Sequence, residues 1–154
     1  MIKKELLVQD CIQSVREFHD AFLIENQDAP VAAIAEKDYL LRHRLMMEEN
    51  DEYLAAAKDG DLVEVADALG DMLYILCGTI LKHGMQDKIV EVFEEIQRSN
   101  MSKLDANGNP IYREDGKVLK SDLYFKRFSS WRYTSLLFFM GRANPAWRRV
   151  RDIR

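Results

Sequence analysis

The sequence predicts an all-α protein, a bundle of four to five helices followed by an irregular C-terminal tail. Three observations support this fold class. Apolar residues recur every three to four positions through most of the first hundred residues, the segment from Val63 to Leu81 is apolar nearly all round, and the periodicity ends beyond Ser99. A chain of 154 residues with 47% hydrophobic residues can bury one core. We therefore expect one domain over residues 1–126 and a separate extension over residues 127–154.

The first two predicted helices are separated by a polar break. Residues 3–25 carry apolar side chains at helical spacing, namely Leu7, Cys11, Val15, Phe18 and Phe22. Asn26 to Pro30 interrupts this pattern. A second helix is then expected from about Glu36 to the Lys58-Asp59-Gly60 segment, because glycine commonly ends a helix.

Two further helices and a turn-rich segment follow. Asp61 is the expected N-cap of the apolar helix over residues 63–81, and Gly84 stands just beyond its C-terminal end. Residues 86–98 show the spacing of a fourth, shorter helix. Beyond it, Asn107-Gly108 and Asp115-Gly116 predict tight turns, so this segment is an ordered tail or, at most, a small hairpin.

Acidic residues stand where the second and third helices are expected to bury apolar side chains. Glu49 and Glu52 continue the stripe that Leu41 and Leu45 begin, and Glu48 lies beside them. The charged residues of the third helix all lie on one face: Glu64, Asp67 and Asp71. Carboxylates from two neighbouring helices are therefore expected to face one another.

Such a cluster favours a metal site. Carboxylates buried together lose solvation and repel one another, so either their pKa values rise or cations join them. Oxygen ligands suit hard divalent ions, and we expect Mg²⁺ as the cofactor, or Mn²⁺ in its place. The alternative is a solvated acidic face with a few ion pairs. Lys and Arg partners at helical spacing are missing between Glu64 and Leu81, which makes an ion-paired stripe hard to draw.

Composition argues against several other classes of protein. Cys11 and Cys77 lie in apolar helical patterns rather than in a Cys-x-x-Cys spacing, which is typical of reduced, buried thiols. The N-terminus lacks the apolar core of a secretion signal, and no run of 18 apolar residues occurs. We therefore expect a cytoplasmic protein with no membrane partner. Residues 127–154 contain seven arginines, no lysine and one acidic residue, so they are either a basic appendage or a junction with unrelated coding sequence.

The spacing resembles a known signature. Glu48-Glu49-x-x-Glu52, followed by acids on the next helix, resembles the EExxE plus ExxD signature of the all-α, MazG-like nucleotide pyrophosphohydrolases. The phrases EVADALGDMLYILCGTILKHG, EEIQRSNMSKLD and EDGKVLK are similar to the phosphoribosyl-ATP pyrophosphohydrolase-like branch. The resemblance covers residues 10–126 and implies a MazG-like helical bundle. It assigns no catalytic role to residues 127–154.

The resemblance implies a role for each acidic residue. Three would be metal ligands: Glu49, Glu52 and Asp71. Glu48 would be either a further ligand or the base that activates water. If Asp71 ends the ExxD motif, Ala68 stands where its first acid belongs. Two alternatives remain: Glu64 and Asp67 are the true ExxD pair, or Asp67 supplies the missing carboxylate.

Candidate substrate-binding residues lie outside the acidic cluster. Asn100 and Lys103 match the N-x-x-K segment that lies near the substrate in this superfamily. Lys117 and Lys120 are candidates to lie over the acidic cleft and meet phosphate oxygens, and the alternative is that they are solvated lysines. His19 is either a polar-face residue or a contact to a nucleobase edge or phosphate.

The sequence thus predicts an Mg²⁺-dependent nucleoside triphosphate pyrophosphohydrolase, which hydrolyses a (d)NTP or related nucleotide to the monophosphate and pyrophosphate. The alternative substrate is phosphoribosyl-ATP. A di-iron bundle is not expected, because no histidine follows a glutamate by three residues. A non-enzymatic helical interaction module with an acidic face is the rival of another class. The expected partners are the nucleotide and further copies of the chain, as a homodimer or homotetramer, and not nucleic acid.

Overall fold

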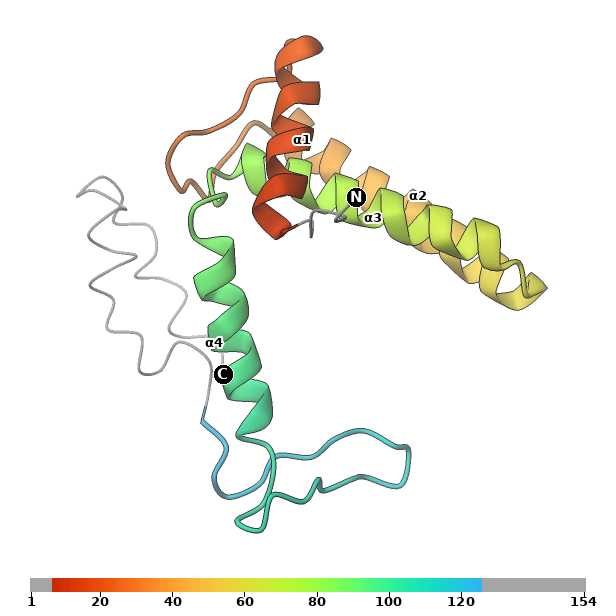
Figure 1. Cartoon of the computed structure of the whole chain (residues 1–154), viewed down its shortest axis with the longest axis vertical. Helices are drawn as coiled ribbons and strands as arrows, with labels where there is room; N and C mark the ends of the chain where they lie inside the picture. Colours follow the sequence, from red (N-terminus) through yellow and green to blue (C-terminus); the bar gives the residue numbers. More distant parts are fainter. Residues whose placement is uncertain (1–6, 126–154) are drawn as a thin grey trace, which may run out of the picture. The chain divides into compact units, whose positions relative to one another are not determined.

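The computed structural model describes residues 7–125, and this part of the chain is all-α, as the sequence predicts (Figure 1). Four helices make up the described residues: α1 (Val8–Ala21), α2 (Glu36–Asp59), α3 (Leu62–Lys82) and α4 (Ile89–Met101). The described residues contain no β-strand, and one isolated antiparallel bridge joins Tyr112 to Val118. The chain divides into two compact units, Met1–Ile89 and Val90–Arg154.

In the first unit, α2 and α3 lie side by side as an antiparallel hairpin (Figure 1). Gly60 closes α2 in the left-handed conformation, with φ of 72°. The side chain of Asp61 then accepts hydrogen bonds from the backbone of Val63 and Glu64, at 2.9 and 3.2 Å. The predicted end of the second helix and the predicted N-cap of the third are both confirmed. A two-residue turn therefore fixes one end of the hairpin.

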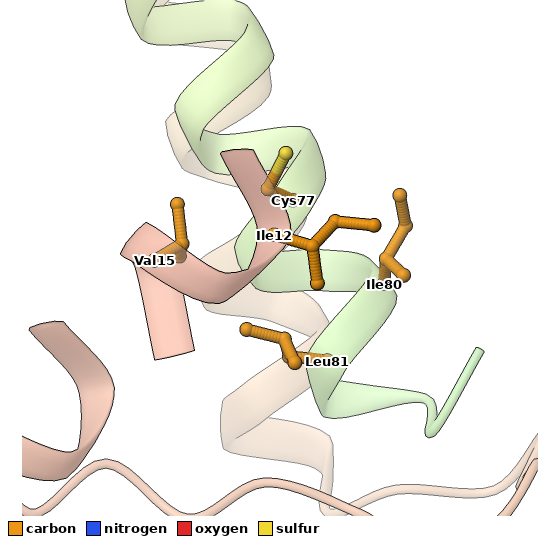
Figure 2. Close-up of a cluster of buried hydrophobic side chains, with 5 residues drawn as sticks. All are labelled: Ile12, Val15, Cys77, Ile80 and Leu81. Carbon is orange, nitrogen blue, oxygen red and sulfur yellow. The ribbon is translucent and has the colours of Figure 1, made fainter. Parts of the chain in front are cut away.

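A small core lies between α1 and α3. Five buried side chains form it: Ile12, Val15, Cys77, Ile80 and Leu81 (Figure 2). Cys11 packs against this cluster, and both cysteines are free thiols. Burying these side chains attaches α1 to the C-terminal half of α3. Among the described helices, none is both long and apolar enough to cross a membrane.

The rest of α3 is more exposed than the sequence suggests. Its apolar character predicts a helix enclosed by a bundle, yet Val63 is 75% exposed and Leu73 is 47% exposed. Within the first unit, α3 packs against α1 and α2. These two neighbours leave apolar faces of α3 uncovered in a single chain.

The predicted first and fourth helices are wrong at both ends by three to five residues. The first helix begins at Val8 rather than near residue 3, and the fourth ends at Met101 rather than at Arg98. The first helix ends at Ala21 rather than near residue 25, because Leu23 takes a left-handed conformation with φ of 55°. The fourth helix begins at Ile89 rather than at Gln86. The backbone carbonyl of Met85 accepts hydrogen bonds from the amides of Lys88 and Ile89, which makes the residues before α4 a separate turn. The predicted helix end at His83-Gly84 is confirmed, and Gly84 has φ of 63°.

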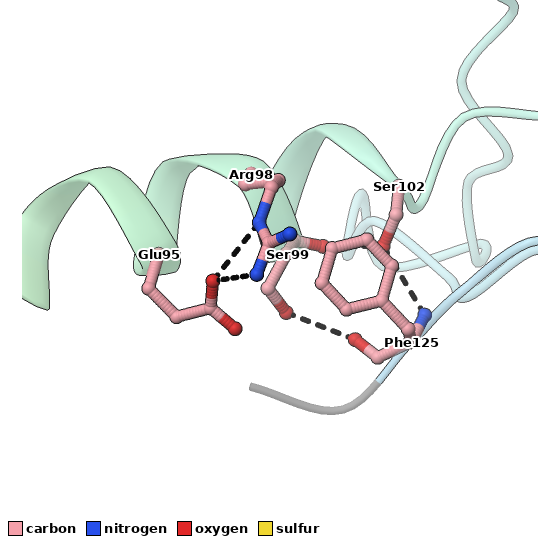
Figure 3. Close-up of polar contacts among 5 residues, drawn as sticks. All are labelled: Glu95, Arg98, Ser99, Ser102 and Phe125. Atoms are coloured by element: carbon pink, nitrogen blue, oxygen red, sulfur yellow. Dashed lines mark hydrogen bonds and ion pairs between the residues drawn. The ribbon is translucent and has the colours of Figure 1, made fainter. Parts of the chain in front are cut away.

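In the second unit, α4 holds the segment that ends at Phe125 (Figure 3). Ser99 donates a hydrogen bond to the Phe125 carbonyl at 3.1 Å, and the Phe125 amide donates to the Ser102 hydroxyl at 3.3 Å. Arg98 lies over the Phe125 ring and pairs with the buried Glu95. Residues 103–125 otherwise contain turns and one bridge, as the predicted small hairpin requires. The Arg-rich extension over residues 127–154 lies outside the described residues.

Candidate metal site

The carboxylates lie along a seam where α2 and α3 face each other. We define the seam by positions three and four residues apart on each helix: Asp38, Arg42, Leu45, Glu49, Glu52 and Ala56 on α2, opposite Lys82, Gly78, Ile75, Asp71, Ala68 and Glu64 on α3. Two distances support this register. Lys82 Nζ lies 3.3 Å from Asp38 Oδ2, and a Cβ built on Gly78 would lie 2.9 Å from Arg42 Nη1. Continuing the same antiparallel register places Glu49 opposite Asp71.

Glu49 is the most perturbed carboxylate of the seam. Its side chain is half-buried, and its Oε2 atom is buried without a hydrogen-bond partner. Loss of solvation raises the pKa of Glu49, and four neighbouring carboxylates raise it further, in the order Glu52, Asp71, Asp67 and Glu48. The structure therefore brings acids from both helices into one electrostatic cluster, as the sequence predicts.

The other acids of the cluster are exposed and differ in their surroundings. Glu52, Asp67 and Asp71 are open to solvent. Glu48 forms an ion pair with Arg44 on its own helix, at 3.8 Å, and so lies beside the seam rather than in it. Glu64 lies in the first turn of α3 and is not among the described carboxylates that raise the pKa of Glu49. This arrangement favours Asp67 over Glu64 as the partner of Asp71.

The donor set fits a hard divalent cation in chemistry. All of its ligand atoms are carboxylate oxygens, and the unpartnered Glu49 Oε2 is the kind of buried polar atom that a bound cation satisfies. Within residues 7–125, however, no group of three or more His, Cys, Asp or Glu side chains is gathered closely enough to hold a metal ion. A bound ion would therefore have to draw these side chains together.

His19 is buried in the core rather than placed on a polar face. Its side chain is 2% exposed, and Nδ1 lies 2.6 Å from Asn26 Oδ1, so Nδ1 carries the proton and donates it. Burial lowers the pKa of His19, and the charges of Arg42 and Lys82 lower it further against the raising effect of the Asn26 hydrogen bond. The imidazole is thus held neutral, with no exposed edge for a nucleobase.

Four candidate substrate-binding residues belong to the second unit: Asn100, Lys103, Lys117 and Lys120. Lys103 donates a hydrogen bond to Asn100 Oδ1 at 2.9 Å, so the structure brings these two together. Lys120 lies over the ring of Tyr124, with its Nζ 4.4 Å from the ring centroid. Lys117 is exposed. The carboxylates belong to the first unit.

A cavity of about 380 Å³ lies elsewhere in the first unit. Gln9, Ile12, Gln13, Arg16, Asp28, Gln86 and Asp87 line it. None of these is a residue of the seam, so the cavity is separate from the carboxylate cluster.

Comparison with known families decides the class of protein. The family model of phosphoribosyl-ATP pyrophosphohydrolase matches residues 15–100, which is more than half of the chain. The chain belongs to this family. A search of curated proteins finds no match. The family lies within the MazG-like, all-α nucleotide pyrophosphohydrolase superfamily, so the protein is a hydrolase of the pyrophosphohydrolase class, and such enzymes depend on metal ions.

The matched residues contain the whole acidic cluster. All six predicted acids lie inside the range 15–100, and so does His19. Asn100 is the last matched residue, while Lys103, Lys117 and Lys120 lie beyond it. The phosphoribosyl-ATP pyrophosphohydrolase match thus coincides with the seam and not with the turn-rich segment that follows α4.

Sequence reasoning missed the residues at the far end of the hairpin. Asp38 and Arg42 precede Leu45 and Glu49 at steps of three and four, so they belong to the same stripe. Following the stripe backwards by two turns would have found them. The sequence does not predict the role of Gly78, because a close approach at a glycine inside a helix is known only when the position of the neighbouring helix is known.

Proposed function

We propose that this protein hydrolyses a nucleotide at a phosphoanhydride bond, releasing pyrophosphate and the corresponding monophosphate, with Mg²⁺ as its cofactor. The broader prediction from the sequence is a (d)NTP or related nucleotide. The family match supports the narrower alternative, phosphoribosyl-ATP, as the first substrate to test. The observation that carries the proposal is Glu49 Oε2, a buried oxygen without a partner among four other carboxylates, in a chain of this family.

Carboxylates in the seam and beside it would hold the cofactor. Glu49, Glu52 and Asp71 are the proposed ligands, and Asp67 is favoured over Glu64 to complete the set, since Asp67 acts on Glu49. A bound divalent ion supplies charge neutralisation for the phosphates and lowers the pKa of water. Glu48 is exposed beside the seam, where it is placed to accept a proton from the attacking water or to serve as a further ligand.

Substrate contacts are proposed for the second unit. Lys103 and Asn100 form a ready donor pair for phosphate oxygens, and Lys117 and Lys120 add positive charge. The burial of His19 argues against a direct nucleobase contact in this conformation.

We also propose that the active form is a homodimer or homotetramer. The α2–α3 hairpin exposes large apolar side chains from both helices: Tyr39, Leu40, Met47, Tyr53, Leu54, Leu62, Val63, Leu69, Leu73, Tyr74 and Leu76. Exposed apolar surface on this scale is typical of a protein interface. Tyr74 and Phe93 are exposed aromatic rings, available to a shared base pocket.

A substrate screen tests the proposed activity. Pyrophosphate release is measured with phosphoribosyl-ATP and each (d)NTP, with and without Mg²⁺, for the wild type and the variant Glu49→Gln. We expect Mg²⁺-dependent release from one of these nucleotides by the wild type alone. Release from none of them, with no change of thermal midpoint on adding Mg²⁺ or Mn²⁺, would instead support the non-enzymatic interaction module. Sedimentation of a fully active 18.0 kDa monomer would contradict the oligomer.

A further inference from the structure

The end of the α2–α3 hairpin opposite the turn carries charged residues that lie outside the carboxylate cluster. At the end opposite the turn, the seam begins with two polar layers, Asp38 facing Lys82 and Arg42 facing Gly78. We propose that these four residues are positioning residues: they hold the open end of the hairpin closed and thereby set the spacing of the carboxylates. This inference rests on the proposed function, because it assigns the open end a role in metal binding.

The need for such a device comes from the carboxylates themselves. From Glu49 to Ala56, the α2 side of the seam contains two acids and one alanine. The facing positions on α3 are Asp71, Ala68 and Glu64. Carboxylates placed this close together repel one another when no cation is bound, because like charges face one another across the seam. Large apolar side chains, which normally hold two helices together, are missing from this stretch of the seam. The middle of the hairpin therefore tends to open.

Two constraints oppose this opening, one at each end. The turn at Gly60 and Asp61 joins the helices covalently and is capped. The open end has no covalent turn, although backbone amides of Gln27 and Val31 donate hydrogen bonds to the carbonyls of Leu81 and His83 and so tie the segment before α2 to the end of α3. Between α2 and α3 themselves, side-chain contacts hold this end together. By the register of the seam, Leu45 and Ile75 are expected to face each other there as one apolar layer beside the two polar layers.

The ion-paired layer is buried enough to constrain geometry. Lys82 is 6% exposed, and its ammonium lies 3.3 Å from the Asp38 carboxylate. A buried cation that lost this partner would be costly to keep in the core. The pair therefore ties the first turn of α2 to the last turn of α3.

The glycine layer sets how closely the helices approach. Gly78 has no side chain, and the space that a Cβ would take is filled by Arg42 from α2 and His19 from α1. A Cβ there would lie 2.9 Å from Arg42 Nη1 and 3.1 Å from His19 Nε2, both closer than normal contact. A larger residue at this position must displace the Arg42 guanidinium, which is the end of a flexible side chain, or the His19 ring, and the proposal requires that part of this displacement passes to the backbone of α2. Arg42 and Glu49 are seven residues apart, about 10 Å along the helix, so the displacement is expected to reach the carboxylates.

A matched pair of glycine variants tests the proposal. Gly70 lies on the same helix, and a Cβ there meets nothing within 4 Å. Gly78→Ala and Gly70→Ala are therefore the same change with and without a clash. Mn²⁺ affinity, kcat and KM are measured at a temperature where circular dichroism shows both variants folded. We expect Gly70→Ala to match the wild type, and Gly78→Ala to lose about tenfold in Mn²⁺ affinity and in kcat, with a smaller change in KM.

A second pair tests the ion-paired layer. Lys82→Met removes the cation, whereas Lys82→Arg keeps it. We expect Lys82→Met to weaken Mn²⁺ binding in the folded protein and Lys82→Arg to restore it. A merely structural role would lower the unfolding midpoint of Lys82→Met and leave Mn²⁺ affinity below that midpoint unchanged, which would contradict the proposal.

Crystal structures of the metal-free glycine variants separate this inference from the proposed function. They report the distance between the Cα atoms of Glu49 and Asp71 without metal or substrate. We expect this distance to grow in Gly78→Ala and to stay the same in Gly70→Ala. An unchanged distance in Gly78→Ala would overturn the positioning role, whatever the activity. Failure of the wild type to bind Mn²⁺ would overturn the proposed function and, with it, the role of the open end in metal binding.

Discussion

The two halves of the α2–α3 hairpin differ in how their charged side chains are arranged. In the open half, Lys82 pairs with Asp38, the Arg42 side chain fills the space beside Gly78, and α1 packs over Cys77 and Leu81. In the half near the turn, the seam carries acids that repel one another. Carboxylates placed together without counter-charges cost stability, so their presence needs a ligand to explain it. The open half thus supports the fold, and the turn half carries the acids proposed to hold the metal ion.

The largest expected effect is on catalysis in the turn half. Glu49→Gln and Glu52→Gln each remove a proposed ligand and should abolish metal-dependent hydrolysis, a loss of about a thousandfold or more. The variants should remain folded, because losing one negative charge relieves repulsion in the metal-free protein. Pyrophosphate release at saturating Mg²⁺ measures the effect. Wild-type turnover in either variant would remove that residue from the site.

The corresponding effect in the open half is on stability. Leu81 is fully buried, so Leu81→Ala leaves a cavity in the α1–α3 core and should cost about 2–5 kcal/mol of unfolding free energy. The same change at Leu123, which is 58% exposed, should cost about 0.5 kcal/mol or less. Urea denaturation measures both. Equal losses at the two positions would show that the small core is not what stabilises the fold.

A finer comparison separates the two candidate acids of α3. Asp67 is among the carboxylates that raise the pKa of Glu49, whereas Glu64 is not. Asp67→Ala should therefore weaken Mn²⁺ binding about tenfold, while Glu64→Ala should bind Mn²⁺ about as well as the wild type. Calorimetric titration of each variant gives the affinities. The reverse order would make Glu64 the first acid of the ExxD pair and assign Asp67 a lesser role.

The smallest effect concerns the pH dependence of the open half. The pKa of His19 is lower in the folded protein than its unfolded value of 6.5, so the unfolded chain binds more protons between these two values. Stability should therefore fall as the pH drops below about 6.5, by at most about 1.4 kcal/mol per pH unit for one proton. His19→Gln should remove this part of the slope. Denaturation curves at several pH values compare the two chains, and identical slopes would show that His19 titrates alike in both states.

The sequence predicts the fold and the acidic cluster well because both depend on local spacing. Helical periodicity places Glu49 and Glu52 on one stripe, and glycine and aspartate at positions 60 and 61 mark the turn that folds α3 back onto it. Tertiary contacts are harder to predict. The burial of His19 depends on where α1 meets α3, and the later start of α4 depends on a turn at Met85, neither of which appears in the spacing of apolar residues.

The most direct test of the contrast between the two halves is a calorimetric titration of Mn²⁺ into the wild type and Glu49→Gln, both held below their unfolding midpoints. The account predicts saturable binding to the wild type and a loss of affinity of about a hundredfold in the variant, since one charged ligand is gone. Equal binding by the two proteins, or no binding by either, would contradict the claim that the acids near the turn form a metal site.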